Sequence, residues 1–193
     1  MQIWINDIIN DKEKMLWLAE KAKIDSTNFT KKNFEDRLDG YIAFHTATYE
    51  SEIVAMAGMY QSPQWHPKLI RICDRTYYFK KARSSALSFL NEKELKSIAS
   101  DYFIPLQTNI ALDMGLIPFY SIWGEKRRPA LEKQVERYNK KMSARSYKMR
   151  KFKILPGMYW TCPGPVTEKE QCRQNISILD TPESDNVFDL PKL

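Results

Sequence analysis

The sequence has no long apolar run. None of its hydrophobic stretches approaches the roughly eighteen residues that a helix needs to span a bilayer. Residues 1–14 carry acids where a signal peptide would need a basic start and an apolar centre. We therefore expect a soluble, cytoplasmic protein with no membrane partner.

Histidine and cysteine are both scarce. The two histidines, His45 and His66, are too few for a histidine-built metal centre and count against a Ser-His-Asp hydrolase. Cys73, Cys162 and Cys172 are odd in number and contain no close metal-ligand pair. Cys162 and Cys172 could pair across a hairpin, but a reduced pair is what a cytosol favours. We expect neither a metal site nor a disulfide framework.

The composition is that of an ordinary globular protein. The chain has 193 residues, of which 43% are hydrophobic and 28% charged, so it is long enough for one domain with a substantial core. It shows no internal repeat and no low-complexity linker. We expect one domain over residues 1–179, followed by an acidic, extended tail over residues 180–193.

Hydrophobic periodicity and turn residues predict an alternation of strands and helices. Expected strands cover residues 3–5, 40–49, 52–60, 69–79, 117–123, 152–161 and 173–179. Expected helices cover residues 11–23, 86–101 and 129–142, with a short one ending at Gly115. This order predicts an α/β fold, a single domain with a mixed, mostly antiparallel sheet flanked by helices.

The central strand ends in cations. Lys80, Lys81 and Arg83 follow its aromatic residues, and Ser84 and Ser85 then open the next helix. Free N–H groups at a helix N-terminus and the helix dipole both favour negative charge, so this junction is a candidate anion site. The alternative is a strand end that exposes its charges to solvent.

Positive charge is concentrated near the C-terminal third. The formal net charge is +6, and residues 126–153 hold twelve lysines and arginines against two glutamates. With Tyr138, Tyr147 and Phe152 interleaved, this segment is a candidate nucleic-acid surface. The alternative is a solvated helix face.

The element order and residues 40–179 resemble the GCN5-related N-acetyltransferase (GNAT) superfamily, in particular divergent members from bacteriophage genomes. In that family the fourth strand binds the pantetheine arm of acetyl-CoA, and a Q/R-x-x-G-x-G/A loop wraps the pyrophosphate. Arg83 agrees with this loop, whereas Ala86 and Ser88 replace its glycines with other small residues. The resemblance implies cofactor-binding residues at Thr76, Tyr77, Tyr78, Arg83, Ser84, Ser85, Ala86, Leu87 and Ser88.

The resemblance implies an acyl-CoA-dependent N-acyltransferase. It would move an acetyl group from acetyl-CoA, or another acyl group from its acyl-CoA, to an amine that the sequence does not identify and that could belong to a nucleic acid or a protein. The alternative is a GNAT-fold protein without catalysis, acting as a basic nucleic-acid-binding or phage accessory module. A phage-encoded protein would work in the host cytoplasm.

Acyl transfer to an amine needs a base for the amine and an acid for the departing thiolate. On the central strand, Asp74 is the first choice for the base, and its alternative role is a strand-end ion pair with Arg71 or Arg75. The resemblance makes Tyr138 the candidate acid, with a core aromatic as its alternative role. The substitutes are Tyr147 for the acid, and His45 and Glu125 for the base.

Overall fold

The chain folds into two compact units in the computed structural model. The first unit comprises Met1–Tyr60 and Cys73–Leu106, and the second comprises Gln61–Ile72 and Gln107–Leu193. The structure describes residues 2–25, 34–35, 37–79, 92–144, 151–161 and 173–187. Strand β4, Leu69–Tyr78, and helix α5, Ile104–Asp113, each contribute residues to both units.

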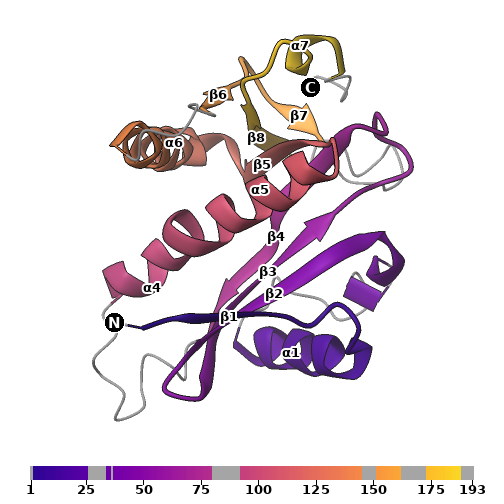
Figure 1. Ribbon diagram of the computed structural model, residues 1–193, viewed down its shortest axis with the longest axis vertical. Helices are drawn as coiled ribbons and strands as arrows, with labels where there is room; N and C mark the ends of the chain where they lie inside the picture. The colour runs from indigo at the N-terminus through magenta and orange to yellow at the C-terminus, as the bar shows by residue number, and fades with distance from the viewer. Residues whose placement is uncertain are drawn as a thin grey trace. The chain divides into compact units, whose positions relative to one another are not determined.

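The sheet of the first unit is built on an antiparallel hairpin. Strands β2, Tyr41–Tyr49, and β3, Glu52–Tyr60, pair over their whole length, as predicted, and appear in Figure 1 as two long neighbouring arrows. Strand β1, Trp4–Asp7, adds to the other edge of β2. Glu50 and Ser51 join the hairpin with positive φ values of 46° and 69°, which suit the right-handed twist of the two strands.

Helix α1, Lys12–Asp25, begins where Asp11 caps it. The Asp11 side chain accepts a hydrogen bond from the backbone N–H of Lys14 at 2.9 Å, which satisfies one of the donors left over in the first turn. The buried residues of the helix recur at helical spacing, and they are Met15, Leu18, Ala19 and Ala22. The predicted helix over residues 11–23 is therefore confirmed.

A π-helical turn interrupts the next helix. Helix α4, Glu92–Ile98, continues through the π-helical segment η2, Ala99–Phe103, into α5. The N–H of Ile104 bonds the carbonyl of Ala99, five residues back. Pro105 follows directly, and its ring cannot fit against the carbonyl four residues before it in a regular helix, so the widened turn relieves that clash.

Residues of α4 and η2 complete the core of the first unit. One buried cluster joins helical side chains to small residues of the hairpin, and its members are Leu95, Ile98, Ala99, Phe103, Ala47, Val54, Ala55 and Ala57. The small hairpin residues let the helix backbone come close to the strands.

The sheet of the second unit begins with a short parallel pairing. Leu69–Arg71 of β4 pair with Ile117–Phe119 of β5, Ile117–Trp123, and both strands extend beyond this segment. Strand β8, Arg173–Leu179, lies antiparallel to β5. The sheet is thus mixed and mostly antiparallel, as the sequence predicted.

The structure divides one of the predicted strands into two. In place of a single strand over residues 152–161, the structure has β6, Phe152–Ile154, and β7, Tyr159–Trp160, both paired with β8. Between them lie Pro156 and Gly157, and Gly157 has a φ of 84°. Proline lacks the N–H that a ladder needs, and this glycine conformation turns the chain out of a strand.

Helix α6, Arg128–Ala144, follows the 3-10 turn η3, Glu125–Arg127, and packs against β6. Its buried residues are Leu131, Val135 and Tyr138. The side chain of Asn139 donates to the carbonyl of Phe152 at 2.9 Å and accepts from the N–H of the same residue at 3.0 Å. This pair of hydrogen bonds fixes the edge strand to the helix.

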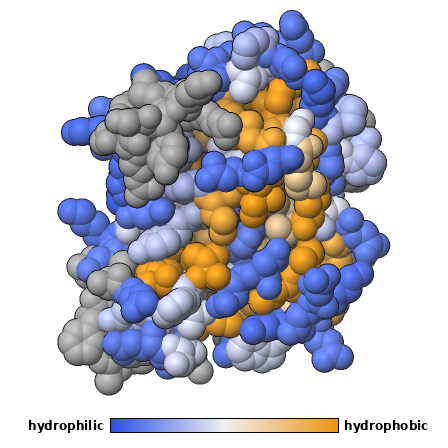
Figure 2. Space-filling view, viewed as in Figure 1, coloured by the Kyte–Doolittle hydropathy of each residue, from blue (hydrophilic) through white to orange (hydrophobic). Residues whose placement is uncertain are grey.

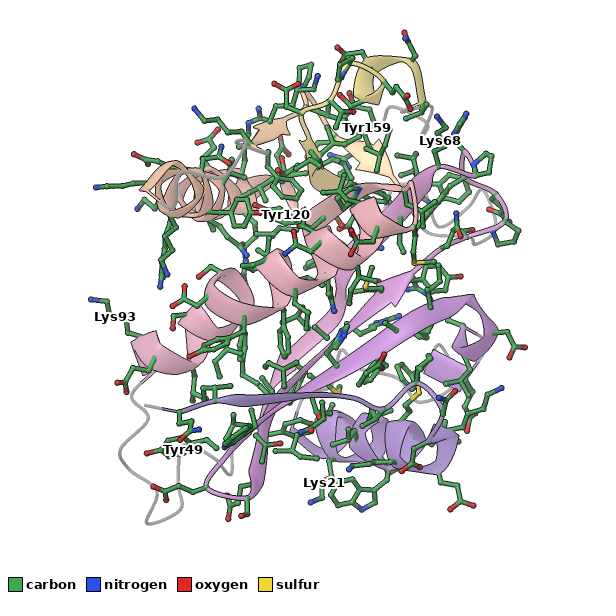
Figure 3. All side chains as sticks on the ribbon, in the orientation of Figure 1. Lys21, Tyr49, Lys68, Lys93, Tyr120 and Tyr159 are labelled. Atoms are coloured by element: carbon green, nitrogen blue, oxygen red, sulfur yellow. The ribbon has the colours of Figure 1, made fainter. Side chains whose placement is uncertain are left out.

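The C-terminal segment is folded as far as Val187, so the expected extended tail is wrong for its first eight residues. Helix α7, Ser184–Val187, is one part of this segment. Figure 2 shows mainly hydrophilic residues where α7 lies. Lys153 pairs with Asp180 at 3.0 Å and with Asp185 at 2.7 Å, and Lys68, labelled in Figure 3, pairs with Glu183 at 2.6 Å. The sequence predicted an extended acidic tail because the lysines that pair with these acids are distant in the chain.

In the part of the chain that the structure describes, no helix is long and apolar enough to cross a membrane.

Candidate functional site

The middle of strand β4, Cys73–Arg75, departs from regular strand conformation, and this segment is called the bulge below. Cys73 and Arg75, on either side of Asp74, have positive φ values of 54° and 52°. This conformation costs a residue other than glycine roughly 1–2 kcal/mol. The hydroxyl of Thr76 donates to the carbonyl of Cys73 at 2.7 Å and closes the bulge on itself. The segment therefore departs from the regular backbone of a strand just where the sequence places the candidate base.

Asp74 is buried and held by two donors. Its side chain is 2% exposed. One carboxylate oxygen lies 3.2 Å from Nη2 of Arg37, and the other accepts a hydrogen bond from the hydroxyl of Tyr41 at 2.7 Å. No sequence pattern pointed to Arg37 or Tyr41, because each lies more than thirty residues before Asp74. The expected alternative role was an ion pair with Arg71 or Arg75, and the ion pair that the structure shows is with Arg37 instead.

Charge and aromatic packing hold this cluster together. The guanidinium of Arg37 lies 3.9 Å from the ring centroid of Tyr60. Burial lowers the pKa of Arg37, but Asp74 and the two tyrosines outweigh it, and the net pKa is above the ordinary value. Burial, assisted by Asp74, raises the pKa of Tyr41 well above its ordinary value. Arg37 thus stays charged and Tyr41 stays a donor at neutral pH.

The side chains after the bulge serve packing. Tyr77 makes an edge contact with Phe79, with ring centroids 5.3 Å apart, and Tyr78 packs against the core cluster of the first unit. Burial raises the pKa of Tyr78 above its ordinary value and that of Cys73 to about 12. The Cys73 thiol therefore stays protonated at neutral pH and is a poor nucleophile. Thr76–Tyr78 would have to contact a cofactor chiefly through their backbone groups.

Several predicted residues lie outside the part of the chain that the structure describes. They are Arg83, Ser84, Ser85, Ala86, Leu87 and Ser88 of the candidate pyrophosphate loop, the substitute acid Tyr147, and the pair Cys162 and Cys172.

Tyr138, the candidate acid, lies in the core of the second unit. It is 1% exposed, and its ring makes an edge contact with Phe152 at a centroid distance of 5.2 Å. The packing matches the alternative role of a core aromatic. A thiolate could meet this hydroxyl only by entering the interior beside α6.

The two substitute bases lie in contrasting surroundings. His45 on β2 is 3% exposed and stands opposite Asp7 in the register of β1 and β2. Burial lowers the pKa of His45, and the nearby Asp7 opposes that shift only in part. Glu125 is exposed in η3, 3.9 Å from Arg173. His45 is a buried neutral group, and Glu125 is a surface carboxylate.

In the described part of the basic segment, cations are exposed, whereas the aromatic residues Tyr138 and Phe152 are buried. Its exposed lysines and arginines on η3 and α6 are Lys126, Arg127, Lys133, Arg137 and Lys140. Tyr138 and Phe152 are 1% and 3% exposed, so the prediction that they are interleaved on this surface to stack on bases is wrong. They lie on the apolar stripe of the helix and on the strand beneath it, where hydrophobic burial outweighs exposure.

Arg71 is a further polar residue that the sequence reading considered only as an ion-pair partner. It is partly exposed on β4, within the second unit. Its Nη2 donates to the hydroxyl of Ser121 at 2.5 Å, and its Nη1 donates to the hydroxyl of Thr161 at 3.3 Å. An arginine between two isoleucines was the available sequence signal, but the sequence could not show its partners, which lie 50 and 90 residues later.

Comparison with known proteins shows similarity in structure only. No known family profile and no curated protein matches the sequence. A GNAT-family acetyltransferase from Desulfovibrio desulfuricans superposes with a TM-score of 0.52 at 12% identity, over 93% of this chain and 99% of that one. A second, from Streptococcus pneumoniae, gives a TM-score of 0.52 at 8% identity, over 93% and 100% of the two chains. The chain has the GNAT fold.

A third GNAT structure was solved with ligands. The diaminobutyrate acetyltransferase of Paenibacillus lautus, in complex with L-2,4-diaminobutyric acid and coenzyme A, has a TM-score of 0.50 at 12% identity, over 92% of this chain and 94% of that one. The expected α/β, GNAT-like fold is therefore confirmed. At 8–12% identity the likeness concerns the GNAT fold, and phage origin, substrate and site residues stay predictions.

Proposed function

We propose that this protein is an acyl-CoA-dependent N-acyltransferase that moves an acetyl group from acetyl-CoA to an amine. The observation that carries the proposal is the bulge of β4 within a GNAT fold, directly before Thr76–Tyr78, for which the resemblance implies contact with the pantetheine arm. Cys73 and Arg75 keep a conformation that costs free energy, and such strain is concentrated at functional sites.

The residues after the bulge offer what a pantetheine arm requires. That arm contains two amide groups, which pair with backbone N–H and C=O groups, and Thr76–Tyr78 would supply these while their side chains hold the strand in place. Arg83 and the loop through Ser88 would bind the pyrophosphate. Acyl-CoA supplies a thioester, whose carbonyl carbon the amine attacks while the C–S bond breaks and the amine proton passes to sulfur.

Asp74 is the proposed base, and it would act through water because both carboxylate oxygens already accept protein donors. Tyr138 is the proposed acid. The structure supplies a competing role for each, an anchor for Asp74 and a core aromatic for Tyr138. Replacing a catalytic acid or base by Asn or Phe lowers kcat of the folded protein by roughly 10²–10⁴. Replacing a purely structural residue would instead change the free energy of unfolding and leave kcat of the folded fraction unchanged.

The first experiment is a calorimetric titration with acetyl-CoA. Wild type should bind saturably, Arg83→Glu should lose binding, and Lys133→Glu should keep it. Lys133 is an exposed cation on α6, so its reversal is the matched control for a change in net charge. The proposal is overturned if wild type gives neither heat nor thermal stabilisation at millimolar acetyl-CoA.

A second candidate function is nucleic-acid binding through α6, favoured by the five exposed cations of η3 and α6. A Lys133→Glu, Arg137→Glu, Lys140→Glu variant should bind a labelled duplex more weakly than wild type, while Arg83→Glu should bind as wild type does. The affinity of wild type should fall steeply with salt, because phosphate contacts release counterions. A flat salt response would exclude a surface that tracks phosphates.

A further inference from the structure

A turn before β2 fixes the backbone of Arg37. The 3-10 turn η1, Leu38–Gly40, follows this residue, and the carbonyl of Arg37 accepts a hydrogen bond from the N–H of Gly40 at 3.0 Å. The N–H of Arg37 donates to the carbonyl of Phe34 at 3.1 Å. Phe34 is fully buried, and its ring makes an edge contact with Phe44 at a centroid distance of 5.5 Å. Hydrogen bonds on both sides and a buried aromatic anchor thus determine where the side chain of Arg37 begins.

Packing also determines the position of Tyr41. Strand register places Tyr41 opposite Tyr60, and their ring centroids are 5.4 Å apart. Gly58, two residues before Tyr60 on β3, leaves the space that the Tyr41 ring fills, because a Cβ at Gly58 would overlap that ring. Glycine inside a strand costs stability and often marks such a close approach. The Tyr41 hydroxyl is therefore directed toward Asp74 by its neighbours as well as by its hydrogen bond.

Each oxygen of the Asp74 carboxylate has a donor of its own. Oδ1 lies 3.2 Å from Nη2 of Arg37, and Oδ2 accepts a hydrogen bond from the hydroxyl of Tyr41 at 2.7 Å. A partial rotation about the Cβ–Cγ bond would weaken at least one of these contacts, so the two donors fix the orientation of the carboxylate. Catalytic groups have to be held in this way, to within about 10–20° of the productive geometry.

The same two donors favour the charged form of Asp74. A guanidinium is always charged in a folded protein, and the side chains of Arg37 and Asp74 are 12% and 2% exposed, so water screens the pair weakly. The hydrogen bond from Tyr41 adds to this preference, because a carboxylate accepts it more strongly than a carboxylic acid does. A general base has to be ionised before it can accept a proton. The arrangement therefore extends toward acid pH the range in which Asp74 is able to act as a base.

Titratable groups from three strands and from the turn before β2 act on Asp74 or on its donors. They are Arg37 from the turn, Tyr41 from β2, Tyr60 from β3, and Cys73 and Arg75 from β4. The arginines keep their charge, and tyrosine and cysteine ordinarily titrate above about pH 8. Burial moves Cys73 further from neutrality, since it raises the pKa of this thiol to about 12. A change of protonation in the acid range within this cluster therefore belongs to Asp74.

We propose that Arg37 is a positioning residue for the acyl transfer: it keeps Asp74 ionised and, together with Tyr41, holds the carboxylate in the orientation of the base. This inference rests on the proposed N-acyltransferase function, in which Asp74 is the base. The cation widens the pH range in which the base is active, whereas a purely structural arginine would affect only the free energy of unfolding. The charge state of Asp74 can be measured without any substrate.

The kinetic test follows the release of coenzyme A from acetyl-CoA with a thiol reagent, with lysine, spermidine or phenethylamine as the amine, whichever gives turnover. The pH dependence of kcat reports the titratable groups of the enzyme–substrate complex. The pH at which kcat falls to half on the acid side, the acid midpoint, should be higher in Arg37→Met than in wild type by roughly 1–3 on the pH scale. Arg37→Lys keeps the charge and should restore most of the wild-type midpoint.

Two further variants make the kinetic test specific. Tyr41→Phe keeps the ring and the ion pair, so it should fold, and it should raise the acid midpoint by less than Arg37→Met does. Lys12→Met is the matched control, because it removes a cation from an exposed pair with Asp39 and should leave the midpoint unchanged. An unchanged midpoint in the folded fraction of Arg37→Met and in Tyr41→Phe, with a loss of stability alone, would overturn the inference.

A titration of Asp74 itself separates this inference from the proposed function. In protein with isotope-labelled aspartate carboxyl groups, Asp74→Asn identifies the Asp74 signal in NMR spectra by its loss. Asp74 should take up its proton at a lower pH in wild type than in Arg37→Met and Tyr41→Phe, and at the wild-type pH in Lys12→Met. That result supports the role of Arg37 in keeping Asp74 ionised even if acetyl-CoA fails to bind, and in that case only the proposed function is refuted. Equal titration midpoints in wild type and in both variants overturn the inference even if the protein is an active acyltransferase.

Discussion

Replacing Asp74 by Asn should destabilise the protein strongly, because it removes the charge that compensates Arg37. The two side chains are 2% and 12% exposed, so solvent screens the pair weakly. Removing one partner of a buried ion pair costs about 3–5 kcal/mol. The hydrogen bond from Tyr41 survives in part, since an amide oxygen still accepts it. We expect a loss of about 3 kcal/mol, which for a chain of this length lowers Tm by about 6–12 °C.

Urea unfolding followed by circular dichroism measures this change, and a double-mutant cycle identifies its cause. Arg37→Met and Asp74→Leu should each cost about 3 kcal/mol, whereas the double variant should cost about 1–3 kcal/mol, less than the sum, because no unpaired charge remains and the main loss is the acceptor of the Tyr41 hydroxyl. If the free energy of unfolding of Asp74→Asn is within about 0.5 kcal/mol of the wild-type value, the cluster does not hold the fold. Additive single losses would show that Arg37 and Asp74 act independently.

Three further predictions follow from burial and backbone conformation. Burial lowers the pKa of His45 in the folded protein. Near pH 6.5 the His45 side chain therefore takes up a proton in the unfolded protein but stays neutral in the folded protein. Stability should therefore fall as the pH drops from 7.5 to 5.5, and the urea midpoint of His45→Gln should fall less than that of wild type. Gly58→Ala would push a methyl group into the ring of Tyr41, and should cost about 1–3 kcal/mol in urea unfolding. Arg75→Val should be about 1 kcal/mol less stable than Arg75→Asn in urea unfolding. Both variants remove the charge, but Asn tolerates a φ of 52° better than Val does. Equal stability of the two variants would contradict the inference that Arg75 is strained.

The sequence predicted elements whose signals are local. The hairpin of β2 and β3 and the strand β5 were placed almost to the residue, because alternation and a two-residue turn define them within twenty positions. The split of β6 and β7 was missed although Pro156 and Gly157 were visible, because aromatic residues on both sides suggested one strand. The order of these elements was enough to suggest the fold.

The candidate site depends on contacts between residues far apart in the sequence, which no local sequence pattern reveals. Asp74 was recognisable as a carboxylate in an apolar strand, which requires a partner, but its partner Arg37 is 37 residues away on a short turn. Arg71 was visible too, and its hydroxyl partners are Ser121 on β5 and Thr161 directly after β7. A single sequence shows that a buried charge needs compensation, and only the fold shows which residue provides it.

The choice of residues in the bulge links stability to function. In the described chain, positive φ occurs at the glycines Gly115, Gly124 and Gly157, and in the hairpin turn at Glu50 and Ser51. In the middle of β4 it keeps Cys73 and Arg75 instead, so surrounding contacts must hold the conformation that glycine would adopt freely. The hydroxyl bond to Cys73 and the ion pair of Asp74 are such contacts. If the bulge shapes the segment that binds coenzyme A, a variant that releases Asp74 should lose acetyl-CoA affinity together with stability.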